Sequence, residues 1–509
     1  MRDQHGELLI MVKSHFARVI AISLAALATG GGLVAPAARA GAPEAVGGSQ
    51  VTVAVDAGQP GPPVNEGLLG TNQPVPGAGP AVSALGVDWA RADFSLDASY
   101  DCATGSWNPA IADQRVQEDL AMGGQPEMIV DYSPPCLTSN PLHETLDPPD
   151  ADGYLPWKAL VQQAAYHEMI TYGVHIFEVW NEPDGTFWHG SIADYLATYK
   201  ATAEAIEAAA NQAHMSDVLI GGPALLFSDS AWLEPFLAYV SLNQLPLGFV
   251  SWHYYGNYPA LGPFATGAGV IPPQLPGLGD YWYNPATLAQ TFGVQVAQVR
   301  AEIAKYPALH PLTVIDEWNL DAGYDPRADG PYDAAFAAAV LDASQGAGLD
   351  RMAFFRVADD KPGTLGNWGM LHADFSPKPV YWAFSFWHQL DGRVLPTSES
   401  PDQTGAAPTG QIGAVASDGM GGTPNVLVYN YASFDPTGGY GSTDPNAYDH
   451  PVTVNIAGLD HGRWDYTVKM VDADAQGQVV RTGTLKPSQR SLALVMPGES
   501  VALIQLTRP

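Results

Sequence analysis

The sequence predicts a (β/α)8 barrel followed by an all-β sandwich. Between residues 63 and 395, short apolar segments alternate with longer stretches of helical periodicity, and eight such units follow one another. Parallel strands need crossover connections, so eight consecutive strand–helix units are typical of a closed parallel barrel. From residue 396 to residue 509 the helical periodicity is lost, and strand-like segments separated by Gly, Asp, Asn and Pro indicate a sandwich.

The expected barrel strands are short apolar runs, and most are followed by an amphipathic stretch. After the fourth strand, Ser191 is a typical N-cap, and apolar residues follow it at spacings of three and four. The first unit offers only a short helical stretch around Ala81–Leu85. The eight strands are expected at Gly67–Gly70, Val87–Phe94, Glu127–Asp131, His175–Trp180, Val218–Gly221, Gly248–His253, Leu312–Asp316 and Arg351–Val357.

The C-terminal segments alternate apolar and polar residues, as strands with one buried face do. Within residues 41–62, the segment Gln50–Val55 has the same alternation and is a candidate to join this module, which would bring the two ends of the chain together. The expected sandwich strands are Asn425–Tyr431, Pro451–Ile456, Trp464–Val471, Val479–Leu485 and Ser500–Leu506.

Composition excludes several classes of partner. Hydrophobic residues make up 46% of the chain and charged residues 15%, which is typical of a globular protein. The formal net charge of −31 argues against nucleic acid, because phosphate backbones are bound by basic surfaces. It also argues against an anionic membrane. A neutral substrate in water is compatible with this charge.

The N-terminus and the cysteine content both bear on the compartment. Lys13 and Arg18 precede the apolar run Val19–Ala28, and Ala38-Arg39-Ala40 has the small-x-small form of a cleavage site. This pattern predicts that residues 1–40 are a signal peptide and that the protein is secreted. The two cysteines, Cys102 and Cys136, follow expected strand ends, so they are either a bridge between neighbouring loops or two separate thiols.

Two glutamates follow expected barrel strands, where the catalytic residues of such barrels lie. Asn181-Glu182-Pro183 follows the fourth strand, and the aromatic neighbours of Glu182 favour a raised pKa by desolvation. Glu317 follows the seventh strand, so the two side chains can face each other across the mouth. Two facing carboxyl groups are what the hydrolysis of a glycosidic bond requires. Asp316 competes for the second role, but strict alternation would point it towards the helices.

Further candidates lie beside Glu317. The sixth strand ends in His253 and Tyr255, either of which can donate a hydrogen bond to this carboxylate, although packing is an equally good account of each. Arg91, at the end of the second strand, is the cation expected to keep Glu317 ionised. Its alternative role is an ion pair with a neighbouring aspartate.

Taken together, these segments resemble glycoside hydrolase family 39, a family of clan A of retaining glycosidases. The resemblance extends from about Glu66 to Pro396. It rests on Asn181-Glu182-Pro183, Glu317-Trp318, the segment Trp252–Tyr255 and the run Gly369–Phe384. The eighth strand departs from the clan, because it contains Phe354-Phe355-Arg356 where many members have a tryptophan under the sugar.

The resemblance implies that Glu182 is the acid/base, Glu317 the nucleophile and Asn181 a ligand of the sugar 2-hydroxyl. We also expect Trp318 and Arg356 to contact the substrate. The implied enzyme needs neither metal nor cofactor and acts on carbohydrate, with exo-acting β-xylosidase activity as the first expectation. The alternatives are an α-L-arabinofuranosidase, an iduronidase-like or endo-acting hydrolase, and a non-catalytic carbohydrate-binding barrel. A metal hydrolase is disfavoured because no His-Glu-x-x-His motif occurs.

Overall fold

The computed structural model describes residues 49–228, 230–256, 289–320, 325–363, 366–400, 412–431 and 448–509. The expected signal peptide at residues 1–40 lies outside these residues. Among the described helices, none combines the length and the apolar character that crossing a bilayer requires.

Eight parallel strands close into a barrel, which confirms the predicted fold class. Each strand pairs with the preceding and the following one of the series, and the last pairs with the first. In order around the barrel they are β2 (Gly70–Asn72), β3 (Trp89–Asp93), β6 (Gln125–Val130), β7 (Ile176–Val179), β8 (Leu219–Leu225), β9 (Phe249–Tyr255), β10 (Leu312–Asn319) and β11 (Arg351–Phe354).

The first barrel strand begins later than the sequence predicted. Residues Glu66–Leu68 form a 3-10 helix, because the Asn65 side chain accepts a hydrogen bond from the backbone N–H of Gly67. β2 starts only at Gly70, where a Cβ atom would lie 2.5 Å from the indole nitrogen of Trp89. The close approach of this indole is the reason that the strand begins on a glycine.

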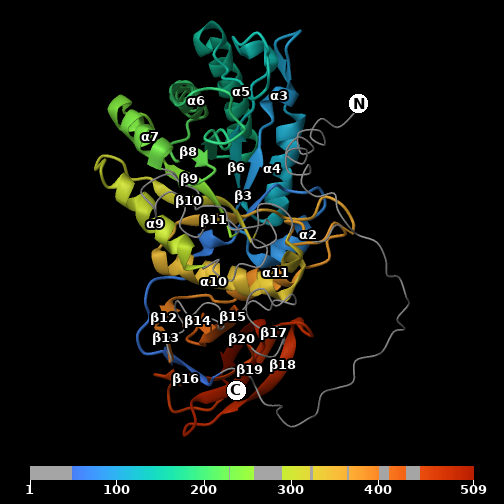
Figure 1. Cartoon of the computed structure of the whole chain (residues 1–509), viewed down its shortest axis with the longest axis vertical. Helices are drawn as coiled ribbons and strands as arrows, with labels where there is room; N and C mark the ends of the chain where they lie inside the picture. Colours follow the sequence, from blue (N-terminus) through green and yellow to red (C-terminus); the bar gives the residue numbers. More distant parts are fainter. Residues whose placement is uncertain are drawn as a thin grey trace, which may run out of the picture. The chain divides into compact units, whose positions relative to one another are not determined.

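The helices surround the barrel strands (Figure 1). Buried apolar residues of the helices and of the strands belong to one core cluster. Ser191 caps α6 as predicted: its hydroxyl accepts from the Asp194 N–H, and the Asp194 carboxylate accepts from the Ser191 N–H, a reciprocal capping box. The helices are α2 (Gly79–Val82), α3 (Leu96–Ser99), α4 (Ala110–Met122), α5 (Leu155–Tyr172), α6 (Ile192–Ala213), α7 (Ser230–Asn243), α9 (Gln290–Ile303), α10 (Pro331–Ala347) and α11 (Pro379–His388).

The barrel interior changes from apolar to ionic along its strands. Its lower layer is a small apolar cluster formed by Trp89, Ile176, Phe249, Val314 and Ala353. Side chains two residues apart point to the same face of a strand. Two positions further along the same strands, the side chains that point into the barrel are therefore those of Arg91, Glu178, Ser251 and Asp316, all with at most 1% exposure. The apolar layer closes the barrel beneath, so the charged layer faces the carboxyl ends of the strands.

The C-terminal strands form two sheets that share an apolar core. In the first sheet, β1 (Val51–Asp56) lies between β13 (Thr397–Ser400) and β16 (His450–Ala457), with β19 (Ser491–Met496) beyond. The second sheet contains β12 (Val394–Leu395), β14 (Ile412–Ser417), β15 (Asn425–Tyr431), β20 (Glu499–Thr507), β17 (Trp464–Val471) and β18 (Gln476–Leu485), in this order.

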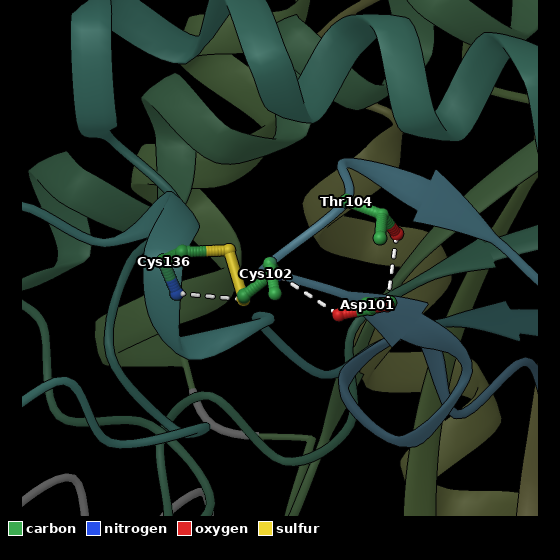
Figure 2. The surroundings of a disulfide bond; sticks show 5 residues. Asp101, Cys102, Thr104 and Cys136 are labelled. Carbon is green, nitrogen blue, oxygen red and sulfur yellow. Dashed lines mark hydrogen bonds between the residues drawn. A yellow bond between two sulfur atoms is a disulfide. The ribbon is translucent and has the colours of Figure 1, made fainter.

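Cys102 and Cys136 form a disulfide, which decides between the two alternatives that the sequence left open (Figure 2). Cys102 lies in the turn of the small hairpin β4 (Tyr100–Asp101) and β5 (Ser106–Trp107), after the second barrel strand. Cys136 lies in the 3-10 helix Pro135–Leu137, after the third. The bond therefore ties together two neighbouring loops at the carboxyl end of the barrel.

Candidate active site

The backbone at the end of β7 is held in an unusual conformation. Trp180 and Glu182 both have positive φ, at 71° and 42°. Such conformations cost about 1–3 kcal/mol each in non-glycine residues and persist only where the surroundings enforce them. Here the Glu182 N–H donates to the Ala224 carbonyl at 2.9 Å, and the Trp180 indole donates to the Phe187 carbonyl at 2.8 Å. These contacts fix the direction in which the Glu182 side chain leaves the strand.

Glu317 reaches the same region because β10 contains a bulge. Its pairing with β9 shifts register between Ile315 and Glu317, so strict alternation fails there. Asp316 follows the alternation from Val314 and points into the barrel, where its carboxyl lies 3.5 Å from Arg91, and not towards the helices as predicted. Glu317 lies above it, with 13% of its side chain exposed.

Two side chains near the carboxyl end of β9 contact the glutamates. His253 Nδ1 lies 2.7 Å from Glu182 Oε1 and 3.7 Å from Glu317 Oε2. The Tyr255 hydroxyl donates to Glu317 Oε1. The prediction gave both residues to Glu317, whereas the structure assigns the hydrogen bond of His253 to Glu182 and that of Tyr255 to Glu317. The alternate residues Trp252 and Tyr254 instead contact α9.

Arg91 connects these groups from below. Its Nη2 donates to the Asn181 side-chain oxygen at 3.0 Å, and its Nη1 lies 3.5 Å from Glu317 Oε2. Its Nε donates to Glu178 Oε2 at 2.7 Å. One guanidinium thus orients the amide of Asn181 and faces the carboxylate of Glu317. The alternative role of Arg91, an ion pair with Asp93 or Asp97, is not adopted by Asp93, which pairs with Arg115.

The electrostatics distinguish the two glutamates. Burial raises the pKa of Glu182 to about 7, against the attraction of Arg91. Burial and the charge of Glu182 raise the pKa of Glu317, but Arg91 and the Tyr255 hydroxyl act in the opposite direction. Burial lowers the pKa of His253 to about 4, so the imidazole beside Glu182 is neutral above this pH. Of the two glutamates, Glu317 has the stronger stabilisation of its ionised form, and Glu182 is suited to hold a proton.

The same groups have the residue types of a metal site, but their spacing is that of hydrogen bonds. Three atoms of the kind that bind metals, a carboxylate oxygen of Glu182, a ring nitrogen of His253 and a carboxylate oxygen of Glu317, lie within 4.8 Å of one another. Two ligands of a tetrahedral zinc at about 2.0 Å would be separated by about 3.3 Å. The 2.7 Å between His253 Nδ1 and Glu182 Oε1 is shorter and is a direct hydrogen bond.

Two expected substrate contacts lie elsewhere. Trp318 is fully buried and packs against Phe292, Phe336 and Phe384 from three helices, because the residue after the bulge points outwards. A side chain in this position stabilises the barrel wall and is not exposed to a ligand. Arg356 forms an ion pair with Asp360, and among the described residues no hydrogen bond or ion pair links it to the glutamates.

Three acidic residues are buried beneath the site, and the prediction had considered only Asp316 among them, as a rival of Glu317. Glu127, Glu178 and Asp316 lie on β6, β7 and β10 with at most 1% exposure, and Ser251 on β9 donates to Glu178. Glu178 was visible in the sequence as a glutamate two residues before a strand end, inside an otherwise apolar segment. A charged residue at an inward strand position was the signal that could have identified it.

The fold and the site define a (β/α)8-barrel protein with two facing carboxyl groups at the carboxyl ends of its fourth and seventh strands. The family described as Glycosyl hydrolases family 39 matches residues 120–476, and the chain belongs to this family. Both glutamates, Asn181 and His253 lie within the matched region.

Similar proteins of known sequence or structure agree with this family. The chain is 26% identical over 312 residues to a beta-xylosidase of Geobacillus stearothermophilus, covering 57% of each protein. It is 26% identical over 328 residues to one of Caldicellulosiruptor saccharolyticus, covering 60% of this chain and 62% of that protein. It thus spans less than two thirds of these relatives. A monomeric beta-xylosidase of Caulobacter crescentus CB15 has the same fold, with a TM-score of 0.69, 20% identity and coverage of 90% of this chain and 99% of that one.

We expect Tyr255→Phe to move the acidic limb of the pH profile of kcat/KM to higher pH. The variant removes a hydrogen bond that lowers the pKa of Glu317, so this group would gain its proton earlier as the pH falls. A hydrogen bond to a charged group contributes about 1.5 kcal/mol, which corresponds to a shift of about one pH unit. Tyr254→Phe is the matched control, because the Tyr254 hydroxyl donates to Thr291 on the outer side. Equal shifts in both variants would contradict the role of Tyr255.

Proposed function

We propose that this protein is a retaining glycoside hydrolase that acts on β-xylosides or closely related glycosides, with Glu182 as acid/base and Glu317 as nucleophile. The observation that carries the proposal is the approach of the two carboxyl groups, whose nearest ligand-type oxygens lie within 4.8 Å. Retaining glycosidases have carboxyl groups about 5–5.5 Å apart, and inverting ones about 6.5–9.5 Å. Similarity to two beta-xylosidases supports the substrate class.

In the first step, Glu317 attacks the anomeric carbon while Glu182 gives its proton to the departing oxygen. A glycosyl–enzyme ester forms, and the aglycone leaves as a neutral alcohol. In the second step, Glu182 accepts a proton from water as that water attacks the anomeric carbon, and Glu317 leaves as a carboxylate. The pKa of Glu182, about 7, suits a group that must first give and then accept a proton.

The surrounding residues serve these two steps. Arg91 and Tyr255 stabilise the charge of Glu317 before attack and again when it departs. His253 is neutral above a pH of about 4, so its contact with Glu182 does not force that carboxyl to ionise. Asn181 is oriented by Arg91, beside Glu182, where its amide can bind a hydroxyl of the sugar.

The first product should have the same anomeric configuration as the substrate. Two successive inversions at one carbon give net retention. Proton NMR of the reaction mixture, recorded before mutarotation, identifies the first anomer released from an aryl β-xyloside. Release of the inverted anomer would remove Glu317 from the nucleophile role and make it a general base.

Replacing Glu182 with alanine should slow cleavage by about 10²–10⁴-fold for poor leaving groups and much less for good ones. An activated aryl oxide departs without the proton that Glu182 supplies, so only the poor leaving groups depend on it. The measurement is kcat/KM over a series of aryl glycosides of graded phenol acidity. Glu168→Gln is the control, because Glu168 is a fully buried glutamate of α5, away from the barrel mouth. An equal loss across the series would indicate a binding role for Glu182.

We also propose that the protein is exported and cleaved near Gly41. The support is the signal-like pattern of residues 1–40 and the disulfide between Cys102 and Cys136, since disulfides persist in oxidising compartments. The intact mass of the secreted protein should correspond to a chain that begins near Gly41 and contains no free thiol. A mass that includes Val19–Ala28 would contradict cleavage.

A further inference from the structure

Beneath the two glutamates, three further carboxyl groups lie in the sealed interior of the barrel. Glu127, Glu178 and Asp316, here called the buried triad, have ligand-type oxygens within 4.8 Å of one another. Each residue is at most 1% exposed. An ionised carboxylate in such a place costs several kcal/mol unless it is paired. Arg91 forms ion pairs with Glu178 and Asp316 of this triad, and it also faces Glu317.

The contacts within the buried triad are unequal. Glu178 accepts from Arg91 Nε at 2.7 Å and also from the Ser251 hydroxyl, and Arg91 Nη2 lies 2.6 Å from the same carboxylate. These donors match an ionised group. Both oxygens of Asp316 lack a protein donor at hydrogen-bonding distance. Their nearest basic groups are Arg91 Nε at 3.5 Å and His253 Nε2 at 3.6 Å.

Asp316 does have a neighbour that can accept. Its carboxyl and that of Glu178 have oxygens within 4.8 Å of each other, and two buried carboxyl groups this close can share a hydrogen bond only if one of them holds a proton. Because Glu178 is surrounded by donors and Asp316 is not, the proton belongs on Asp316.

We propose that Asp316 is a positioning residue that remains un-ionised in the working enzyme and donates its proton to Glu178, which leaves Glu178 as the single anion that anchors Arg91 from below. The charge of Arg91 is then divided between Glu178 and Glu317. If Asp316 were also ionised, two anions would compete with Glu317 for one guanidinium. This inference rests on the proposed function for its catalytic consequence, although the proton itself can be detected without any substrate.

The directions of the pKa shifts agree with this arrangement. Burial and the charge of Glu178 raise the pKa of Asp316 far above its usual range. Burial acts on Glu178 as well, but Arg91, with the hydrogen bonds from Asp316 and Ser251, reverses the effect and lowers its pKa. The titratable groups that face Asp316 are Arg91 from β3, Glu127 from β6, Glu178 from β7, His253 from β9 and its neighbour Glu317.

The first test compares the acidic limbs of the pH profiles of kcat/KM for Asp316→Asn and Glu178→Gln. Asp316→Asn replaces one neutral donor with another, so its limb should stay within about 0.3 pH unit of the wild-type value. Glu178→Gln removes an anion that shares Arg91, so the pKa of Glu317 should fall and the limb should move about one pH unit lower. A downward shift in Asp316→Asn of about one unit would overturn the proposal, whether or not Glu178→Gln folds.

The second test needs no activity. Un-ionised carboxyl groups and carboxylates absorb at different infrared frequencies, so the neutral-pH difference spectrum between wild type and Asp316→Asn shows which form was lost. We expect loss of an un-ionised carboxyl band. Loss of a carboxylate band would overturn the proposal. Glu168→Gln is the matched control: Glu168 is fully buried without a hydrogen-bond partner among the described residues, and its pKa is raised to about 8. It should lose the same band without moving the pH profile. Absence of glycosidase activity would refute the proposed function and leave this test valid.

Discussion

The buried positive charge of Arg91 is the interaction on which the interior of the barrel depends. With 1% of its side chain exposed, the guanidinium contacts residues from β7, the loop after β7 and β10. Removing one partner of a buried ion pair typically costs about 3–5 kcal/mol, because the other charge remains without compensation. Loss of Arg91 would leave the charge of Glu178 buried without compensation, and it would remove the hydrogen bond that orients Asn181. The stability of the barrel and the orientation of the site are therefore properties of the same ion network.

Most of the architecture could be predicted because it follows from the spacing of apolar residues along the sequence. Short apolar runs identified the barrel strands, alternation with a period of two identified the sandwich strands, and the spacing after Ser191 identified α6 and its N-cap. The two glutamates followed from their position after the fourth and seventh strands. Two of the sandwich strands that escaped prediction have weak patterns: Thr397–Ser400 is polar throughout, and Ser491–Met496 is rich in Leu, Ala and Met, which favour helices.

The details of the site could not be predicted because they depend on departures from regularity. The bulge in β10 brings Glu317 to the barrel mouth and turns Trp318 outwards, and a register shift arises from pairing with β9 and not from local sequence. The left-handed backbone at Trp180 and Glu182 is likewise enforced by contacts from other segments. The role of Glu178 required Arg91, whose strand is separated from β7 by a further strand in the barrel. Each of these features is a consequence of tertiary structure.

The position of β1 has a consequence for the order in which the protein can be built. β1 is the first described strand to leave the ribosome, yet it lies between β13 and β16, which are synthesised after the whole barrel. Until then, its backbone N–H and C=O groups have no partners and its valines have no core to enter. The barrel strands can meet during translation, whereas this sheet must wait for nearly the entire chain. An interrupted synthesis that ends after α11 would therefore yield a barrel with an unpaired N-terminal strand, open to pairing with other chains.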